Sequence, residues 1–198
     1  PSVIQAKKWI NEGKIGPVKI VQADFGYKME FNPHSRLFDP SLAGGALLDL
    51  GVYPISFSQY IMEKMPETIL ATAIFSKTNV DETTSILLKY KNAVANLFCS
   101  VVSRTINTGY IFGENGYILL PDFHKAFSAK LFTPDHNVVE SFEDNRKSWG
   151  YNYEIQHVTD KLLKGAVESD IASFSISQQV QEIMTEIRKQ IALKYPDE

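Results

Sequence analysis

The sequence predicts an α+β fold, with a mostly antiparallel open sheet and helices packed on one face of it. The expected order is one strand, one helix, many strands and then helices, whereas a doubly wound parallel sheet alternates strands with helices. Asn115-Gly116 lies between two β-rich runs and is the strongest hairpin signal in the chain. Residues 94–102 alternate between two faces, one more polar than the other, as in an antiparallel sheet covered on one side.

The N-terminal region predicts a short helix followed by a strand. Residues 3–11 have the apolar spacing of an amphipathic helix, and Gly13 is typical of a helix stop. Residues 18–27 have the composition of a strand, with apolar side chains on one face at Val21, Ala23, Phe25 and Tyr27.

A long polar loop is expected over residues 28–43, and long loops inside compact domains are often functional. Its cations are Lys28 and Arg36, either of which can bind an anionic or hydroxylated substrate. We interpret Lys28 as a solvated loop charge and His34 as an exposed loop histidine. For Arg36, substrate binding and a solvated charge both stay open.

The loop leads into Gly44-Gly45-Ala46-Leu47-Leu48-Asp49-Leu50-Gly51-Val52-Tyr53-Pro54, which predicts the start of a buried helix continuing to about Met62. Glycine inside a helix costs roughly 1 kcal/mol against alanine, so Gly51 indicates a close approach to the backbone. Asp49 and Tyr53 are four residues apart and therefore share a helix face. Spacing alone favours a helix packed on a sheet, with Tyr53 as a core aromatic capped by Asp49, over a site formed by the carboxylate and the phenol.

Strands dominate the middle of the chain. Three are expected within residues 67–103, then a hairpin over 110–120, then two more over 126–132 and 138–142. His124 and His136 lie beside turns, and neither has a second ligand at metal spacing. We therefore expect both histidines at the surface and no metal site.

Helical periodicity returns over residues 153–164, where the apolar positions are Ile155, Val158, Leu162 and Leu163. A helix packed on the sheet is favoured over direct catalysis by Tyr153 or His157. Trp149 and Tyr151 precede this run, and they either border a pocket or form a helix-entry staple.

A last helix is expected over residues 175–195. Its apolar positions recur at helical spacing, which indicates a stripe that packs on the core: Val180, Ile183, Met184, Ile187 and Ile191.

Composition is ordinary for a soluble globular chain and excludes several classes of function. The 198 residues carry a net charge of −3 with no dominant basic patch, which argues against nucleic-acid binding, and no apolar run is long enough to span a membrane. The single cysteine, Cys99, excludes an internal disulfide and predicts a buried thiol in a reducing, cytoplasmic setting. The sequence has no G-x-G-x-x-G, P-loop, H-E-x-x-H or C-x-x-C motif, so this chain should not hold a dinucleotide by itself.

Residues 35–43 (SRLFDPSLA) followed by GGALLDLGVYP resemble the glucose-fructose oxidoreductase, inositol dehydrogenase and MocA family. Weaker matches are GKIGPV at 13–18 and WGYNYEIQH at 149–157, and the similarity points to the dihydrodiol-dehydrogenase-like branch. It covers only the family's C-terminal domain. The resemblance therefore implies that residues 1–17 are a connecting helix from an absent Rossmann domain, and that 18–198 form an α+β substrate and oligomerisation domain.

The resemblance also implies an activity. Family members pass hydride between NAD or NADP and a carbon bearing a hydroxyl or carbonyl, and a residue at the position of Tyr53 moves the proton. A phenol has an unperturbed pKa of about 10, so a phenol acting as a base near neutral pH needs a cation nearby. The family supplies a lysine for this from a Glu-Lys-Pro motif in the nucleotide domain. Asp49 is assigned positioning, and Arg36, Trp149 and Tyr151 substrate binding.

These assignments predict a half-site that is inactive alone. The motif helix would pack across a cleft against the Rossmann domain, with Gly45 allowing close approach of the cofactor. The expected substrate is a sugar, polyol or dihydrodiol, and the choice between NAD and NADP would lie in the absent domain. The open sheet face predicts a homodimer, since an uncovered apolar sheet surface needs a partner. The alternatives are a non-catalytic ligand-sensing or dimerisation domain of the same fold, and a free-standing α+β module, against which the start of the chain in mid-helix weighs.

Overall fold

A computed structural model describes residues 1–196 and contains one eight-stranded sheet. The strands are β1 (Val18–Gly26), β2 (Thr68–Phe75), β3 (Asp81–Lys89), β4 (Val94–Ser100), β5 (Gly109–Gly113), β6 (Tyr117–Leu120), β7 (Ser128–Phe132) and β8 (Val138–Glu143). They follow the order β2-β3-β4-β1-β5-β6-β7-β8, in which only β1 and β4 pair in parallel. The expected α+β fold with a mostly antiparallel sheet is therefore confirmed.

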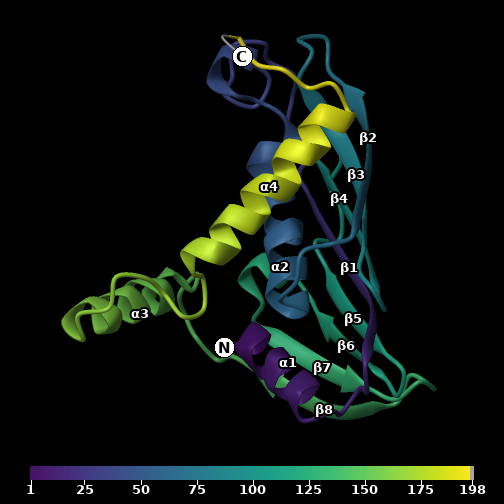
Figure 1. Cartoon of the computed structure of the whole chain (residues 1–198), viewed down its shortest axis with the longest axis vertical. Helices are drawn as coiled ribbons and strands as arrows, with labels where there is room; N and C mark the ends of the chain where they lie inside the picture. The colour runs from purple at the N-terminus through teal and green to yellow at the C-terminus, as the bar shows by residue number, and fades with distance from the viewer. Residues whose placement is uncertain (197–198) are drawn as a thin grey trace.

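Three helices cover one face of the sheet and leave the other face open (Figure 1). They are α1 (Ser2–Asn11), α2 (Val52–Met62) and α4 (Phe174–Gln190). Short turns occur at η1 (Pro40–Leu42) and η3 (Phe123–Lys125), and a π-helical turn, η2 (Leu47–Gly51), leads into α2. No helix within residues 1–196 is long and apolar enough to cross a bilayer.

The core lies between these helices and the covered face of the sheet. The alternation expected from the sequence is observed in β1, where Val21, Ala23 and Phe25 are buried, and in β4, where Ala95, Leu97 and Cys99 are buried. Helix α1 belongs to the same core because Ala6 and Trp9 are buried too. The division of the chain at residue 17 stays a prediction.

The last helix matches its expected stripe but ends earlier than predicted. Val180, Ile183, Met184 and Ile187 are buried, while α4 ends at Gln190 instead of Tyr195. Ala192 adopts a left-handed backbone with φ of 57°, which turns the chain back toward the core. Tyr195 is consequently buried, and its hydroxyl donates a hydrogen bond of 2.7 Å to the carbonyl of Gly44.

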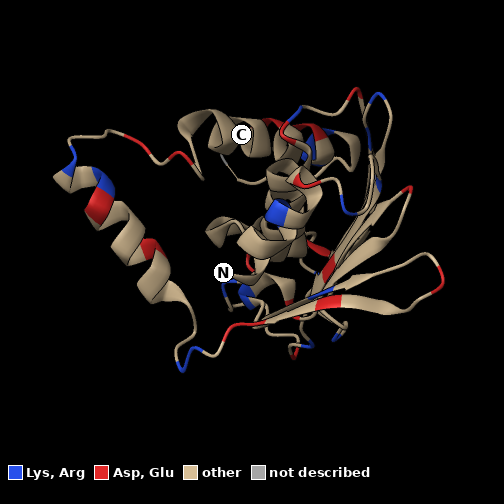
Figure 2. Ribbon diagram, turned by 90° about the horizontal axis from the view of Figure 1, so that it is seen from below, with Lys and Arg blue, Asp and Glu red and all other residues tan. Residues whose placement is uncertain are grey.

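Helix α3 (Tyr151–Leu163) was expected to pack on the sheet, and that prediction is wrong. None of its residues is buried, and Figure 2 shows the helix standing away from the sheet on the side that carries the other helices. Of its predicted apolar positions, Ile155, Val158 and Leu162 share one helix face and Leu163 lies off it. All four are more than half exposed.

Candidate active site

The glycine-rich motif lies directly on the sheet through Gly51. A Cβ at this position would lie 3.1 Å from the sulfur of Cys99 on β4, which is closer than ordinary van der Waals contact. Glycine therefore allows η2 and the start of α2 to approach the strand. Cys99 is fully buried, and burial raises the pKa of its thiol well above the usual range, in agreement with an inert structural role.

A buried carboxylate holds the start of the motif. Asp81, at the beginning of β3, accepts hydrogen bonds of 2.7 Å from the backbone N–H of Leu47 and from the hydroxyl of Thr84. Burial raises the pKa of Asp81 to about 6, although these donors act in the opposite direction. Gly45 has φ of 125°, and a Cβ there would lie 2.2 Å from Oδ1 of Asp81. The close approach that Gly45 permits is thus made by Asp81, and contact of Gly45 with a cofactor stays a prediction.

Tyr53 projects from the first turn of α2 into open space. Its side chain is 44% exposed, so the interpretation of Tyr53 as a core aromatic is wrong. The ring packs against Phe25 of β1 with centroids 4.8 Å apart. Within residues 1–196 its hydroxyl makes no hydrogen bond, which leaves the phenol oxygen available to a ligand.

Arg36 and Asp49 form an ion pair beside Tyr53. Both guanidinium Nη atoms of Arg36 donate to the carboxylate, the longer contact being 3.4 Å from Nη2 to Oδ2. This hydrogen bonding raises the pKa of Arg36, and the nearby Tyr53 contributes in the same direction. The part of the chain that the structure describes contains no hydrogen bond between Asp49 and Tyr53, so the carboxylate orients the arginine instead of the phenol.

One cavity of about 690 Å³ joins most of the predicted site residues. Arg36, Asp49 and Tyr53 line one side of it, while Trp149 and Tyr151 line another from the start of α3. Lys125 reaches the Trp149 ring, with Nζ 4.7 Å from the ring centroid, which ties the loop before α3 to the body of the domain. Among residues 1–196, Gly45 is the only predicted site residue that does not line this cavity.

His124 is a further residue of the site that the sequence placed at the surface. Its ring packs against Phe25 at 4.3 Å and lies 6.3 Å from the Tyr53 ring, edge to face. Its Nε2 is 3.4 Å from the hydroxyl of Tyr27, and its Nδ1 is buried without a partner among residues 1–196. Burial, with help from the charge of Lys125, lowers the pKa of His124 to about 4. Since its aromatic neighbours come from distant segments, no local signal identifies it.

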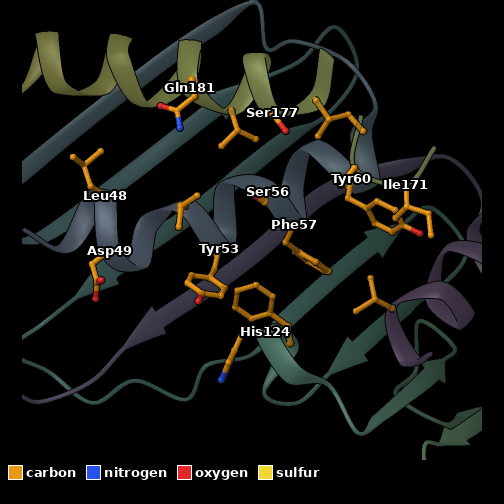
Figure 3. A pocket seen from close by; sticks show the side chains of 16 residues that line it. Leu48, Asp49, Tyr53, Ser56, Phe57, Tyr60, His124, Ile171, Ser177 and Gln181 are labelled. Carbon is orange, nitrogen blue, oxygen red and sulfur yellow. The ribbon is translucent and has the colours of Figure 1, made fainter. Parts of the chain in front are cut away.

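A second cavity, of about 660 Å³, lies on the other side of Tyr53 between α2 and α4 (Figure 3). Its walls are mostly apolar, and they include Leu48, Phe57, Tyr60, Ile171 and Ile176. Tyr53, Asp49 and His124 border both cavities. The phenol therefore stands where two ligand-sized spaces meet.

The polar groups at the candidate site are the Tyr53 phenol, the Arg36–Asp49 ion pair and the His124 imidazole. Residues 1–196 contain no group of three or more His, Cys, Asp or Glu that could hold a metal ion. The sequence has no glycine-rich turn for a pyrophosphate, as noted above. The Tyr53 phenol is open to solvent at the junction of the two cavities.

Comparison with known proteins identifies relatives along the whole chain. Residues 3–119 match the family model described as the GFO/IDH/MocA C-terminal domain. The chain is 32% identical over 212 residues to trans-1,2-dihydrobenzene-1,2-diol dehydrogenase of Mus musculus, covering 100% of this chain and 61% of the relative. The enzyme of the same name from Oryctolagus cuniculus is 31% identical over 209 residues, with 100% and 62% covered. The chain thus spans about three fifths of the length of these relatives.

Solved structures show the same fold. Aldose-aldose oxidoreductase from Caulobacter crescentus, complexed with glycerol, superposes with a TM-score of 0.82 at 18% identity, covering 96% of this chain and 58% of that one. Levoglucosan dehydrogenase, in complex with NADH and levoglucosan, gives a TM-score of 0.78 at 18% identity, with 94% and 60% covered. A 3-ketoreductase from Actinomadura kijaniata in complex with NADP gives 0.75 at 18% identity, with 95% and 56% covered.

Proposed function

The chain belongs to the GFO/IDH/MocA family, whose C-terminal domain it matches, and from this membership we propose that it is the substrate-binding and proton-transferring half of an NAD(P)-dependent oxidoreductase. The observation that carries the proposal is the half-exposed phenol of Tyr53, which has no hydrogen-bond partner within residues 1–196 and lies between two cavities beside an ion pair. The substrate class is a sugar, polyol or dihydrodiol, in keeping with the names of the relatives.

Tyr53 moves the proton of the substrate hydroxyl. In the direction of reduction, the phenol donates its proton to the carbonyl oxygen while the carbonyl carbon receives a hydride. In the direction of oxidation, the phenolate accepts the hydroxyl proton while the hydride leaves. A bound nicotinamide supplies or accepts that hydride, and its dinucleotide would be held by a further domain. General acid–base catalysis by a positioned side chain typically contributes about 10²–10⁴-fold in rate.

The other cavity residues bind and orient the substrate. In the Arg36–Asp49 pair, the guanidinium can donate hydrogen bonds to the hydroxyl oxygens of a polyol and the carboxylate can accept them from its hydroxyl groups. Trp149 and Tyr151 supply apolar faces for a ring. Because the activating lysine and the cofactor site would come from the further domain, we propose that this chain is inactive alone.

A second candidate function is a non-catalytic ligand sensor or dimerisation domain of the same fold. The observation that favours it is the cavity that Arg36, Asp49 and Tyr53 line, which can hold a polyol without a cofactor. A sensor would bind a polyol without turnover, and its response would not depend on the Tyr53 hydroxyl.

The first experiment is the intact mass of the protein purified from its natural source. A mass that exceeds this chain by about 100–150 residues supports a two-domain dehydrogenase, because that is the size of one further domain. A native protein that consists of this chain alone contradicts the dehydrogenase proposal.

The residue-level test is Tyr53→Phe in the full-length protein. We expect cofactor affinity to be unchanged and turnover to fall by about 10²-fold or more, since only the proton-transferring oxygen is removed. Cofactor titration and steady-state kinetics with candidate polyols measure the two effects. Turnover at the wild-type level would contradict the assignment, and ligand binding without turnover in the wild type would favour the sensor.

A further inference from the structure

Helix α3 is a 13-residue arm without a buried residue. Isolated helices of this length are marginal in water, and most helical stability in proteins comes from packing an apolar face. Figures 1 and 2 show the arm standing away from the helices and the sheet. A covering partner is therefore the simplest source of its stability.

The arm carries one apolar stripe. Tyr151, Ile155, Val158 and Leu162 are separated by four, three and four residues, so they lie on one face of the helix. Their exposed fractions are 68%, 63%, 52% and 67%. Contiguous exposed apolar surface of this kind marks an interaction site.

The polar flank of α3 already has partners within the chain. His157 Nε2 lies 2.9 Å from the hydroxyl of Ser169, and Lys161 Nζ lies 2.7 Å from Oδ2 of Asp170. The return segment 164–173 thus runs along the polar flank. This arrangement sets the rotation of the helix. Val158 and Leu162 border a small cavity against residues 166–169 but stay more than half exposed.

The position of the stripe indicates what covers it. Its first residue, Tyr151, lines the cavity that contains Arg36 and Tyr53, so the stripe continues the wall of the candidate site. Figure 2 shows α3 on the helix side, with the helices between it and the sheet. A second copy bound to the open sheet face would lie on the opposite side of the molecule from α3.

We propose that the stripe Tyr151–Ile155–Val158–Leu162 is a docking surface for the nucleotide-binding domain of the same protein. This inference rests on the proposed function, in which a nicotinamide held by a further domain reaches Tyr53. The relatives extend well beyond the 61% of their length that this chain spans, which is room for such a domain. Docking on α3 places that domain beside the cavity and fixes Trp149 and Tyr151 at its rim.

Hydrogen exchange on the full-length protein tests the docking directly. We expect the α3 amides to be protected in the wild type, independently of protein concentration. Leu162→Glu should raise their exchange rates by about tenfold or more, because it puts a charge into an apolar contact. Leu163→Glu is the matched control: it adds the same charge to the next residue, which is 81% exposed and lies off the stripe. Its exchange should stay within about twofold of the wild type.

Three outcomes would overturn the inference. These are unprotected α3 amides in the wild type, equal effects of Leu162→Glu and Leu163→Glu, or protection that appears only as protein concentration rises, which would indicate a second copy. The readout is independent of turnover. Loss of turnover in Tyr53→Phe with an unprotected α3 would reject the docking alone, whereas a protected α3 with an active Tyr53→Phe would reject the proposed catalysis alone.

Discussion

His124 shows how tertiary burial changes the chemistry of a single side chain. A histidine in a turn ordinarily titrates near neutral pH, and this ring would then carry charge in mildly acidic solution. Packing between Phe25 and Tyr53 instead favours the neutral imidazole and lowers the pKa from 6.5 to about 4. The cavity wall beside Tyr53 therefore stays uncharged at this position near neutral pH.

This lowered pKa predicts a dependence of stability on pH. Between pH 6.5 and 4 the unfolded chain binds a proton at His124 that the folded chain does not. The contribution of the neutral imidazole to the free energy of unfolding is therefore fully present above pH 6.5 and is lost as the pH falls toward 4. His124→Asn removes the titrating group. We expect the wild-type chain to lose free energy of unfolding relative to His124→Asn as the pH falls from 7 to 4, which urea denaturation at several pH values measures. Parallel curves for the two proteins would contradict the burial of this imidazole.

Arg36 belongs to an exposed ion pair, so we expect its removal to change the stability of the fold little and the turnover of the full-length protein much more. Exposed pairs typically contribute between 0 and about 1 kcal/mol. Arg36→Gln should therefore change the free energy of unfolding by less than about 1 kcal/mol. Turnover of the full-length protein should fall by about tenfold or more, because the charged fork that meets Asp49 is lost.

The matched control for Arg36 is Lys28→Gln, in the same loop. Lys28 is exposed and was interpreted as a solvated charge, so its removal should leave turnover unchanged. An equal loss of turnover in Arg36→Gln and Lys28→Gln would mean that the net charge of the loop matters and that the pairing of Arg36 with Asp49 does not.

At the scale of elements, the site depends on how the turn before α2 is anchored. Asp81 holds the backbone N–H of Leu47, and Tyr195 holds the carbonyl of Gly44 from the end of the described chain. Both partners come from segments distant in sequence. The helix that carries Asp49 and Tyr53 is thus fixed at its start by a strand and by the segment after α4.

Gly45→Ala tests this anchoring. The substituted residue would need φ near 125°, which L-residues rarely adopt, and its Cβ would overlap Oδ1 of Asp81. We expect the free energy of unfolding to fall by at least about 2 kcal/mol. Gly13→Ala is the control, since it also has a positive φ, of 73°, but meets no atom within 4 Å. It should cost about 1 kcal/mol, measured by the same denaturant unfolding.

An equal loss in the Gly45→Ala and Gly13→Ala variants would contradict a special contact with Asp81. Backbone strain would then account for both values, and the motif would be anchored through Tyr195 and Gly51 instead.

The sequence predicted what depends on local pattern and missed what depends on distant partners. Alternation correctly assigned the buried face of β1 and β4, and the stripe of α4 was read from its spacing. Spacing correctly put Tyr53 on a helix face, but the core position that spacing alone favoured is wrong, since the side chain is 44% exposed. The ion pair of Arg36 with Asp49, the burial of His124 and the unpacked state of α3 depend on contacts between separate elements, which no periodicity encodes.

At the scale of the whole molecule, the open sheet face carries leucine and aromatic side chains with two amides among them. Leu70, Leu87, Asn96, Gln22 and Tyr110 are successive partners across five neighbouring strands. A second group on the same side consists of stacked rings, with Tyr117 and Phe132 centroids 4.6 Å apart and Tyr110 and Phe112 centroids 5.5 Å apart. Half-buried aromatic rings and exposed leucines of this extent are typical of a protein–protein interface.

This face predicts a homodimer, which a single added charge should weaken. Leu87 lies in the middle of β3 and is 36% exposed, so Leu87→Glu keeps the fold but would bury a carboxylate between two sheets. Sedimentation should show a dimer for the wild type and an increase of at least about tenfold in the dissociation constant of the variant. Ile4→Glu is the control, because Ile4 is 55% exposed on α1, away from the open face. A dimer that is weakened by Ile4→Glu and not by Leu87→Glu would place the interface on the helix side, where it would compete with the docking surface on α3.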